Sequence, residues 1–184
     1  YSIENTTSIE RWMDGLEGII PPIIGDLYNL EFLDLWTNNL VGEIPPTLGN
    51  LTNLNYLSLG RNQLSGEIPS EIYSLTNLET LHIQENFISG EISPEIGNLV
   101  NLTWIMFNDN QISGEIPSEI SNIQNDGINP GGGIHLQLHN NLLSGLIPES
   151  ICDVNLAYGA YADGHHGFKI YGNKLCPPYP SCLS

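Results

Sequence analysis

The chain has 184 residues, 40% of them hydrophobic, and it carries 21 Asp and Glu against four Lys and Arg, a formal net charge of -17. This negative charge repels the phosphate backbone of nucleic acids, so we expect no nucleic-acid partner. No apolar run approaches the roughly 20 residues of a membrane-spanning helix, so we expect no membrane insertion.

Residues 1–26 contain an incomplete copy of a 24-residue repeat whose regular copies begin at Leu27. Asp14 takes the place of a recurring Asn, and it is followed at the repeat spacing by Gly18, Ile20 and Pro21. We predict a strand over about residues 6–13, with Ile9 pointing inward. A short helix is the alternative, because Thr7 and Glu10 have the spacing of a capping box.

Residues 27–122 contain four regular copies of the repeat, which begin at Leu27, Leu51, Leu75 and Leu99. Each copy has two apolar residues separated by one position, such as Leu57 and Leu59, and this two-residue period predicts a short strand. An Asn follows each strand at a fixed offset, where its amide can bond the backbone of its own turn and of the next coil. We therefore predict a structural ladder formed by Asn38, Asn62, Asn86, Asn110, Asn141 and Asn173.

The second half of each copy reads Gly-Glu-Ile-Pro or a close variant, as in Gly66–Pro69. The Gly lets the chain bend, and the Pro excludes a regular helix or a central strand on the return side of the coil. A single copy cannot bury its apolar face, so neighbouring copies must stack.

The stretch Leu64-Ser-Gly-Glu-Ile-Pro69 resembles the signature of the plant-specific class of leucine-rich repeats. That class occurs in extracellular parts of plant receptor kinases, in inhibitors of fungal polygalacturonases, in an ice-binding relative and in some secreted bacterial proteins. The resemblance implies an α/β solenoid: a right-handed coil of about seven turns, with a parallel sheet on its concave face and short 3-10 or irregular segments on its convex side. It also implies a secreted, extracellular or cell-surface protein.

The repeat rhythm is interrupted twice after Ile123. Turn-forming residues accumulate over 125–133, so we expect residues 123–153 to be one repeat with an inserted loop. A second insertion around 157–166 precedes the last coil and C-terminal cap, which we assign to residues 154–184. Both insertions precede a strand, so we expect them on the same rim of a single domain spanning 1–184.

The chain has three cysteines. Its ending, residues 175–182, resembles the closing segment of extracellular plant-class repeats, in which paired cysteines hold the last coil. The proline-rich loop between Cys176 and Cys182 favours a disulfide between these two and leaves Cys152 free. Cys152 with Cys182 is the alternative, because these residues lie close in repeat phase, one coil apart.

No nucleophile motif, phosphate loop or dinucleotide fingerprint is present, so we expect no enzyme, no catalytic residues and no cofactor. On a strand His135 and His139 would lie about 13 Å apart, too far for one zinc ion. His165 and His166 have no ligand-spaced Cys or carboxylate nearby, so we expect no metal site. Glu43, Glu67, Glu91 and Glu115 occupy the same position of successive copies and should stack. We expect their side chains to form a ladder exposed to solvent, and weak binding of divalent cations between coils is the alternative.

The outward residues of the strands vary between copies, so we expect them to bind the ligand. Aromatic, Met and Arg side chains, which are enriched at recognition surfaces, are frequent among them. These candidate binding residues are Phe32, Asp34, Trp36, Tyr56, Ser58, Arg61, His82, Gln84, Trp104, Met106 and Asn108.

From this surface we predict a monomeric, non-catalytic recognition module for a protein or peptide, or less readily for a polysaccharide. One alternative is an ice-binding or surface protein that uses the regular repeat surface, for which the column containing Asn29 comes nearest. Another is a spacer within a longer receptor or adhesin.

Overall fold

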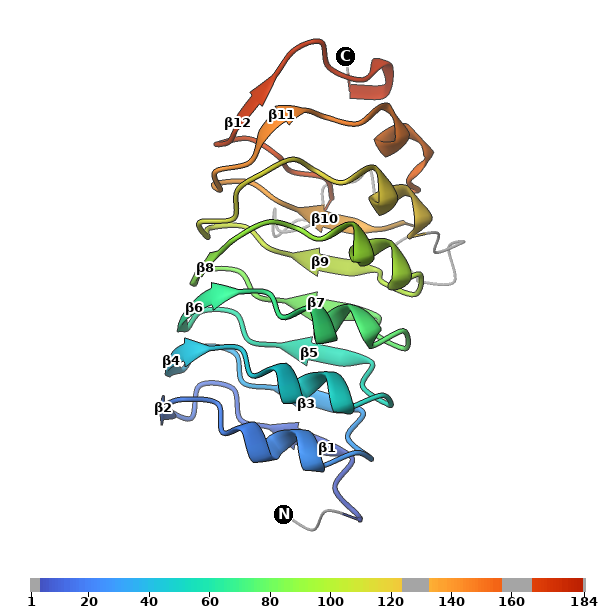
Figure 1. Ribbon diagram of the computed structural model, residues 1–184. Helices are drawn as coiled ribbons and strands as arrows, with labels where there is room; N and C mark the ends of the chain where they lie inside the picture. Colours follow the sequence, from blue (N-terminus) through green and yellow to red (C-terminus); the bar gives the residue numbers. More distant parts are fainter. Residues whose placement is uncertain (1–3, 124–132, 157–166, 184) are drawn as a thin grey trace.

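The computed structural model describes residues 4–123, 133–156 and 167–183, whose elements stack along one axis (Figure 1). Six parallel strands form the first sheet in chain order: β1 (Ser8–Glu10), β3 (Phe32–Asp34), β5 (Tyr56–Ser58), β7 (Thr80–His82), β9 (Trp104–Met106) and β10 (His135–Gln137). An isolated bridge from Gln137 to Lys169 extends this sheet into the last coil. The repeat therefore forms the expected solenoid.

A second set of parallel strands lies on another side of the coil. It consists of β2 (Glu17–Gly18), β4 (Asn39–Glu43), β6 (Gln63–Glu67) and β8 (Phe87–Ser89), with β11 (Ser144–Leu146) paired to β12 (Lys174–Cys176) further along. The sequence did not lead us to expect these strands. In β4, β6 and β8 a single apolar residue is buried, such as Leu64, and β2, β11 and β12 have none, so the pattern is too short to show a two-residue period.

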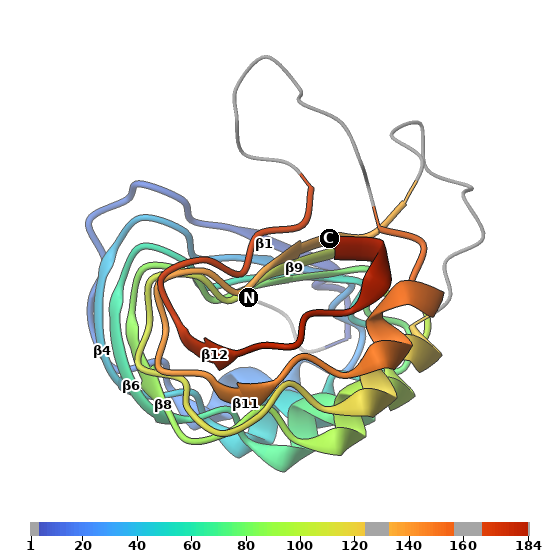
Figure 2. The same ribbon diagram turned by 90° about the horizontal axis from the view of Figure 1, so that it is seen from above.

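Short 3-10 helices form the remaining side of each coil. They are η1 (Pro22–Asp26), η2 (Pro46–Asn50), η3 (Ser70–Ser74), η4 (Pro94–Asn98), η5 (Ser118–Asn122), η6 (Glu149–Asp153) and η7 (Ser181–Leu183). Pro or Ser with an extended backbone precedes each of η1 to η6, as at Pro45 (φ -69°, ψ 130°). Seen along the stack, these helices lie across the coil from the first sheet (Figure 2). The expected 3-10 segments are confirmed.

The interior of the stack is apolar, and equivalent residues of successive coils lie directly against one another. Leu33, Leu57 and Leu81 are paired in register along the first sheet and are each at most 1% exposed. Each coil thus buries its apolar residues against its neighbours, as a repeat that cannot fold alone requires.

The six asparagines expected to form a ladder do so. Asn62 is representative: its Nδ2 donates to the carbonyl oxygens of Leu35, Leu59 and Gly60, and its Oδ1 accepts from the backbone N–H of Leu40. Asn38, Asn86, Asn110, Asn141 and Asn173 make the equivalent contacts. The residue before each of these asparagines turns the chain with a positive φ, for example 55° at Thr37 and 54° at Arg61.

The N-terminal coil contains a strand at Ser8–Glu10, where a short helix was the alternative. β1 pairs with β3 so that Ile9 lies opposite Leu33, and Ile9 is 6% exposed. Arg11 is exposed and forms an ion pair of 3.2 Å with Asp14. The predicted strand is therefore present, but it covers only Ser8–Glu10 and not the whole of residues 6–13.

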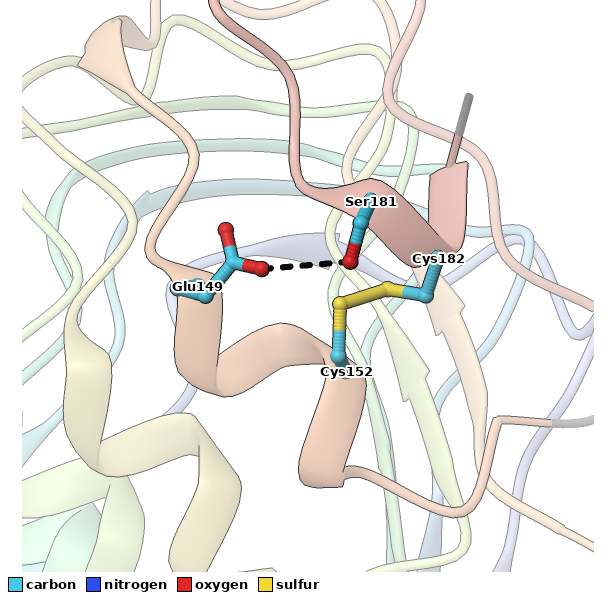
Figure 3. Close-up of a disulfide and its surroundings, with 4 residues drawn as sticks. All are labelled: Glu149, Cys152, Ser181 and Cys182. Atoms are coloured by element: carbon cyan, nitrogen blue, oxygen red, sulfur yellow. Dashed lines mark hydrogen bonds between the residues drawn. A yellow bond between two sulfur atoms is a disulfide. The ribbon is translucent and has the colours of Figure 1, made fainter.

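The predicted disulfide between Cys176 and Cys182 is wrong. Cys152 in η6 is bonded to Cys182 in η7, with a Cα–Cα distance of 5.7 Å (Figure 3). Cys176 is an exposed free thiol. The reason is the stacking of η6 and η7 on one side of consecutive coils, where Ser181 Oγ also donates to Glu149 Oε1 at 3.3 Å. Cys176 lies in β12, on a different side of the coil.

The two predicted insertions lie outside the described residues, apart from Gly133 and the strands that follow them. Within the described ranges, no helix combines the length and the apolar character that crossing a membrane requires.

Candidate functional site

Outward side chains of the first sheet form a surface that we call the strand face. Because the strands are parallel and in register, equivalent side chains stack one coil apart. One column contains Phe32, Tyr56, Thr80, Trp104 and His135, and the next contains Asp34, Ser58, His82, Met106 and Gln137. A third follows the strand ends, at Trp36, Gly60, Gln84, Asn108 and His139. The structure thus brings the predicted strand residues together, and Arg61 lies in the turn beside them.

Aromatic and imidazole rings pack against one another along this face. Phe32 and Tyr56 are stacked with centroids 4.1 Å apart, and Trp104 and His135 are also 4.1 Å apart. His82 connects the two pairs through edge contacts of 5.9 Å to Tyr56 and 6.2 Å to Trp104. The Phe32–Tyr56 and Trp104–His135 pairs therefore turn ring faces toward each other, whereas His82 meets its neighbours edge to face.

A hollow of about 340 Å³ lies in the middle of the strand face. We call it the Gly60 hollow, because Gly60 is the one position of the third column between Trp36 and His139 that has no side chain. The carboxamide of Gln84 folds over this glycine: a Cβ atom at Gly60 would lie 2.7 Å from both Cδ and Oε1 of Gln84. The hollow is lined by Trp36, Tyr56, Ser58, Arg61, His82, Gln84, Glu85, Met106, Asn108 and Gln137.

An ion pair forms one rim of the hollow. Arg61 Nε donates to Glu85 Oε1 at 2.8 Å, and the Arg61 guanidinium lies 5.2 Å from the centre of the Trp36 ring, within cation–π range. Asp34 Oδ1 accepts from the backbone N–H of Trp36 at 3.0 Å, which fixes the start of the turn. Arg61 is thereby held by both its neighbours.

Three buried polar atoms around the hollow have no hydrogen-bond partner among the described residues: Trp36 Nε1, His82 Nε2 and Gln84 Oε1. Burial lowers the pKa of His82 to about 4, so this ring is neutral at physiological pH. Burial and the nearby Asp34 carboxylate both raise the pKa of Tyr56. The hollow therefore combines uncharged rings with unsatisfied hydrogen-bonding groups.

Models of leucine-rich repeats match most of the chain. One, described as two copies of leucine-rich repeats, covers residues 28–74, and the single leucine-rich repeat covers residues 77–99, 101–123 and 134–154. The chain belongs to the leucine-rich repeat family. No curated protein sequence matches it.

Solved structures similar to this leucine-rich repeat protein include plant receptors, which makes its repeats plant-type. The plant peptide hormone receptor RGFR1 in complex with RGF2 is 35% identical, with 86% of this chain and 23% of that chain covered and a TM-score of 0.73. The BIR3–SERK2 complex from Arabidopsis thaliana is 33% identical, with 83% of this chain and 73% of that chain covered and a TM-score of 0.61. A plant ice-binding protein shares the fold, with a TM-score of 0.59. It is 23% identical, and the match covers 95% of this chain and 67% of that chain. The chain spans about a quarter of the length of the first receptors, between 22% and 28%.

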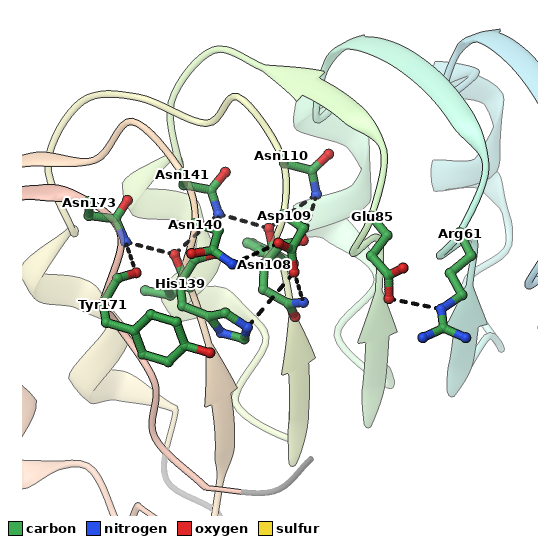
Figure 4. Close-up of polar contacts among 12 residues, drawn as sticks. Arg61, Glu85, Asn108, Asp109, Asn110, His139, Asn140, Asn141, Tyr171 and Asn173 are labelled. Atoms are coloured by element: carbon green, nitrogen blue, oxygen red, sulfur yellow. Dashed lines mark hydrogen bonds and ion pairs between the residues drawn. The ribbon is translucent and has the colours of Figure 1, made fainter. Parts of the chain in front are cut away.

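A polar cluster continues the strand face toward the C-terminal coil (Figure 4). Asp109 accepts hydrogen bonds from Asn108 Nδ2 at 2.7 Å and Asn140 Nδ2 at 2.8 Å, and His139 Nε2 lies 3.8 Å from its carboxylate. The His139 ring packs at 4.6 Å from that of Tyr171. Burial lowers the pKa of His139, while Asp109 acts in the opposite direction.

Sequence reasoning missed part of this face, namely Thr80, Gln137, His139 and Tyr171. The insertions displace His139 and Tyr171 from the 24-residue period, and we had considered the histidines only as metal ligands. Continuing the outward columns past the first insertion would have identified Gln137 and His139.

Metal ligands are not grouped in the described part of this leucine-rich repeat protein: no cluster of three or more His, Cys, Asp or Glu could hold an ion there. His135 packs on Trp104 and His139 on Tyr171, whereas His165 and His166 lie outside the described residues. In the glutamate column each side chain lies over the glycine of the next coil, as Glu43 lies over Gly66.

Proposed function

We propose that this leucine-rich repeat protein is a monomeric, non-catalytic, extracellular recognition module that binds a peptide or protein through the strand face. The observation that carries the proposal is the Gly60 hollow, which adjoins a row of packed aromatic rings and holds three unpaired polar atoms. The lining also combines aromatic, Met and Arg side chains, which are enriched at recognition surfaces.

The similar receptors support this choice of ligand. Besides RGFR1 with RGF2, they include the Arabidopsis receptor kinase HAESA in complex with the peptide hormone IDA and the co-receptor SERK1. The disulfide between Cys152 and Cys182 supports an extracellular location, because disulfides persist in oxidising compartments.

The geometry of the rings favours a peptide over a polysaccharide. A sugar ring packs on an aromatic face, and Phe32 and Tyr56, with an interplanar angle of 9°, cover one face of each other. The ring edges and the intervening polar groups that remain accessible suit the mixed surface of a peptide.

The length of the face sets the size of the bound segment. From the coil of Trp36 to that of His139 there are four strand-to-strand steps of about 4.8 Å, which together span about 19 Å. An extended peptide covers that distance with about six residues. The Gly60 hollow, near the lower end of the roughly 300–1,000 Å³ typical of ligand pockets, accommodates one group of such a peptide.

The test uses a partner captured from the native surroundings of the protein and surface plasmon resonance on single variants. Trp36→Ala and Trp104→Ala should each weaken binding at least about tenfold, because aromatic residues in the centre of an interface dominate its affinity. Glu43→Ala in β4 and Glu91→Ala just after β8 lie away from the strand face and are controls that should change the affinity little. If the glutamate variants lost affinity and the tryptophan variants kept it, the binding site would lie on the side of the glutamates and the proposed strand-face site would be wrong.

The alternative ice-binding function would use a regular column of small polar residues. The structure gives the nearest such column a structural role, because Asn29, Asn53, Asn77 and Asn101 each donate to a backbone carbonyl oxygen of the preceding coil. A thermal-hysteresis assay separates the two functions, and clear activity in it would replace our proposal.

A further inference from the structure

We propose that the peptide bound on the strand face is cationic, and that one of its arginine side chains binds at the N-terminal end of this face. The guanidinium group stacks on the uncovered face of the Phe32 ring and pairs with the carboxylates of Glu10 and Asp34. We call the surface formed by Ser8, Glu10, Phe32 and Asp34 the Phe32 site. The inference rests on the function proposed above and names the chemical class of its ligand.

The orientation of the Phe32 ring leaves one of its faces open. Phe32 and Tyr56 are register partners on adjacent strands, and their rings stack at 4.1 Å with an interplanar angle of 9°. One face of Phe32 therefore lies against Tyr56, and the other points toward β1, the first strand of the sheet (Figure 1). The register partner of Phe32 on β1 is Ser8, whose small side chain is exposed. A flat ligand group can thus reach the second face of the ring.

Two carboxylates flank this open ring face. Glu10 and Asp34 are register partners that project from β1 and β3 on the same side of the sheet as Ser8 and Phe32, one strand spacing of about 4.8 Å apart. Ser8 Oγ donates to Glu10 Oε1 at 3.0 Å, which places the Glu10 carboxylate beside the open space. Like charges directly opposite each other on adjacent strands are destabilising, and a cation bound between them relieves that repulsion.

The basic residues of the neighbouring coils are paired with other carboxylates. Arg11 forms its ion pair with Asp14 at 3.2 Å, and Arg61 forms its ion pair with Glu85 at 2.8 Å. Within the described residues, no ion pair involves Glu10 or Asp34.

The charge around the Phe32 site favours a basic partner. Glu31, which is exposed and directly precedes Phe32, adds a third carboxylate. The whole chain has a formal net charge of -17, which attracts a cationic peptide before contact is made. Charge complementarity therefore identifies the occupant of this end of the strand face.

Arginine suits the site better than lysine does. A guanidinium group is planar, stacks on an aromatic face, and presents several N–H donors in a fixed fork that matches carboxylates. A cation over an aromatic ring adds about 0.5–1 kcal/mol at an exposed position. The lysine ammonium is a compact and strongly hydrated charge, so it can neutralise the carboxylates without using the plane of the Phe32 ring.

The inference is tested on the intact protein, labelled with nitrogen-15, by NMR titration at low salt. The probes are the N-acetyl methylamides of arginine, lysine and citrulline, since citrulline has nearly the shape of arginine without its charge. The arginine probe should shift the backbone amide signals of β1 and β3 in a saturable manner. It should bind at least about fivefold more tightly than the citrulline probe, and high salt should weaken its binding.

Variants separate the ring from the charges. Phe32→Leu should remove the preference for arginine over lysine, and the double variant Glu10→Gln, Asp34→Asn should remove the preference for arginine over citrulline. Phe87→Leu in β8 and Glu17→Gln in β2 make the same changes at exposed positions of the second sheet. These two are the matched controls and should leave the affinities unchanged. The spectrum of each variant reports whether it is folded.

Equal affinity for the arginine and citrulline probes, or no saturable shift in β1 and β3, would overturn the inference. A lysine probe that binds as tightly as the arginine probe would overturn the assignment of arginine. Failure of the proposed function is distinguishable from these outcomes. If Trp36→Ala weakens binding of the captured partner while Phe32→Leu does not, the strand face remains the recognition surface and only the arginine site is wrong.

Discussion

At the scale of single residues, the ladder asparagines connect the two halves of each coil. Asn62 bonds to backbone groups of its own turn and of the preceding coil, and it is 8% exposed. Its neighbour Arg61 adopts a positive φ of 54°, which L-residues other than Asn, Asp and Gly rarely adopt. Four hydrogen bonds to one amide are what make this turn rigid.

Replacing Asn62 with Ala should therefore lower the free energy of unfolding by roughly 1–3 kcal/mol, because it leaves buried backbone groups without partners. Asn55→Ala, at a partly exposed position just before β5, is the control and should have a smaller effect. Chemical denaturation measures both. Equal midpoints would show that the amide of Asn62 does not stabilise the fold.

The partly buried His82, whose ring is largely removed from water, predicts a pH dependence of stability. Its pKa in the folded protein is about 4, below the ordinary value of 6.5, so the unfolded chain binds the extra proton more readily. The contribution of neutral His82 is complete above about pH 6.5 and is lost as the pH falls toward 4.

A His82→Phe variant lacks this titration. The difference in unfolding free energy between the wild-type protein and the variant should be constant above pH 6.5 and should then fall, to the disadvantage of the wild-type protein. A difference that stays constant from pH 7 to 4 would mean that His82 is not buried in its neutral form.

At the scale of elements, the sequence predicted what repeats and missed what depends on orientation. The strand period, the ladder and the 3-10 segments follow from local patterns that recur in each copy. The pairing of Cys152 with Cys182 depends on how η6 and η7 face each other, which sequence spacing does not contain. The Gly60 hollow likewise depends on where the Gln84 side chain lies, although the glycine itself was visible in the sequence.

Because the interfaces between coils are nearly equivalent, a whole coil should be dispensable for folding. Deleting residues 51–74 joins Asn50 to Leu75, which occupies the place of Leu51, so every remaining strand keeps its register. Circular dichroism and thermal melting should show a folded, cooperative protein of reduced stability.

Deleting only residues 51–62 is the control. It joins Asn50 to Gln63, so the end of one 3-10 helix would be followed directly by a strand of the second sheet, and the protein should not fold. Similar cooperative melting of both deletion variants would contradict the assignment of repeat phase.

At the scale of the whole molecule, stability depends on neighbours, so the two ends of the stack have fewer contacts than the middle. The disulfide joins the last two 3-10 helices across a sequence separation of 30 residues. Closing a loop of that length contributes about 3–4 kcal/mol in the chain-entropy description. The C-terminal end is thus held covalently where stacking contacts are missing.

Cys182→Ser should therefore increase amide hydrogen exchange in η6 and β12 while leaving β3 and β5 unchanged. Cys176→Ser removes the free thiol and is the matched control, with no change expected. Equal effects of the two substitutions would restore the pairing of Cys176 with Cys182.

The strand face has a consequence for how recognition can change in such a protein. The columns of the strand face repeat in every coil, so exchanging the residues at two neighbouring positions of one column would move those side chains by one strand spacing, about 4.8 Å, along the stack. For a peptide bound along the strand face as proposed, one such step corresponds to about one residue and a half of the peptide. Because the backbone fixes the spacing between strands, recognition by such a repeat surface can change only in steps of one coil.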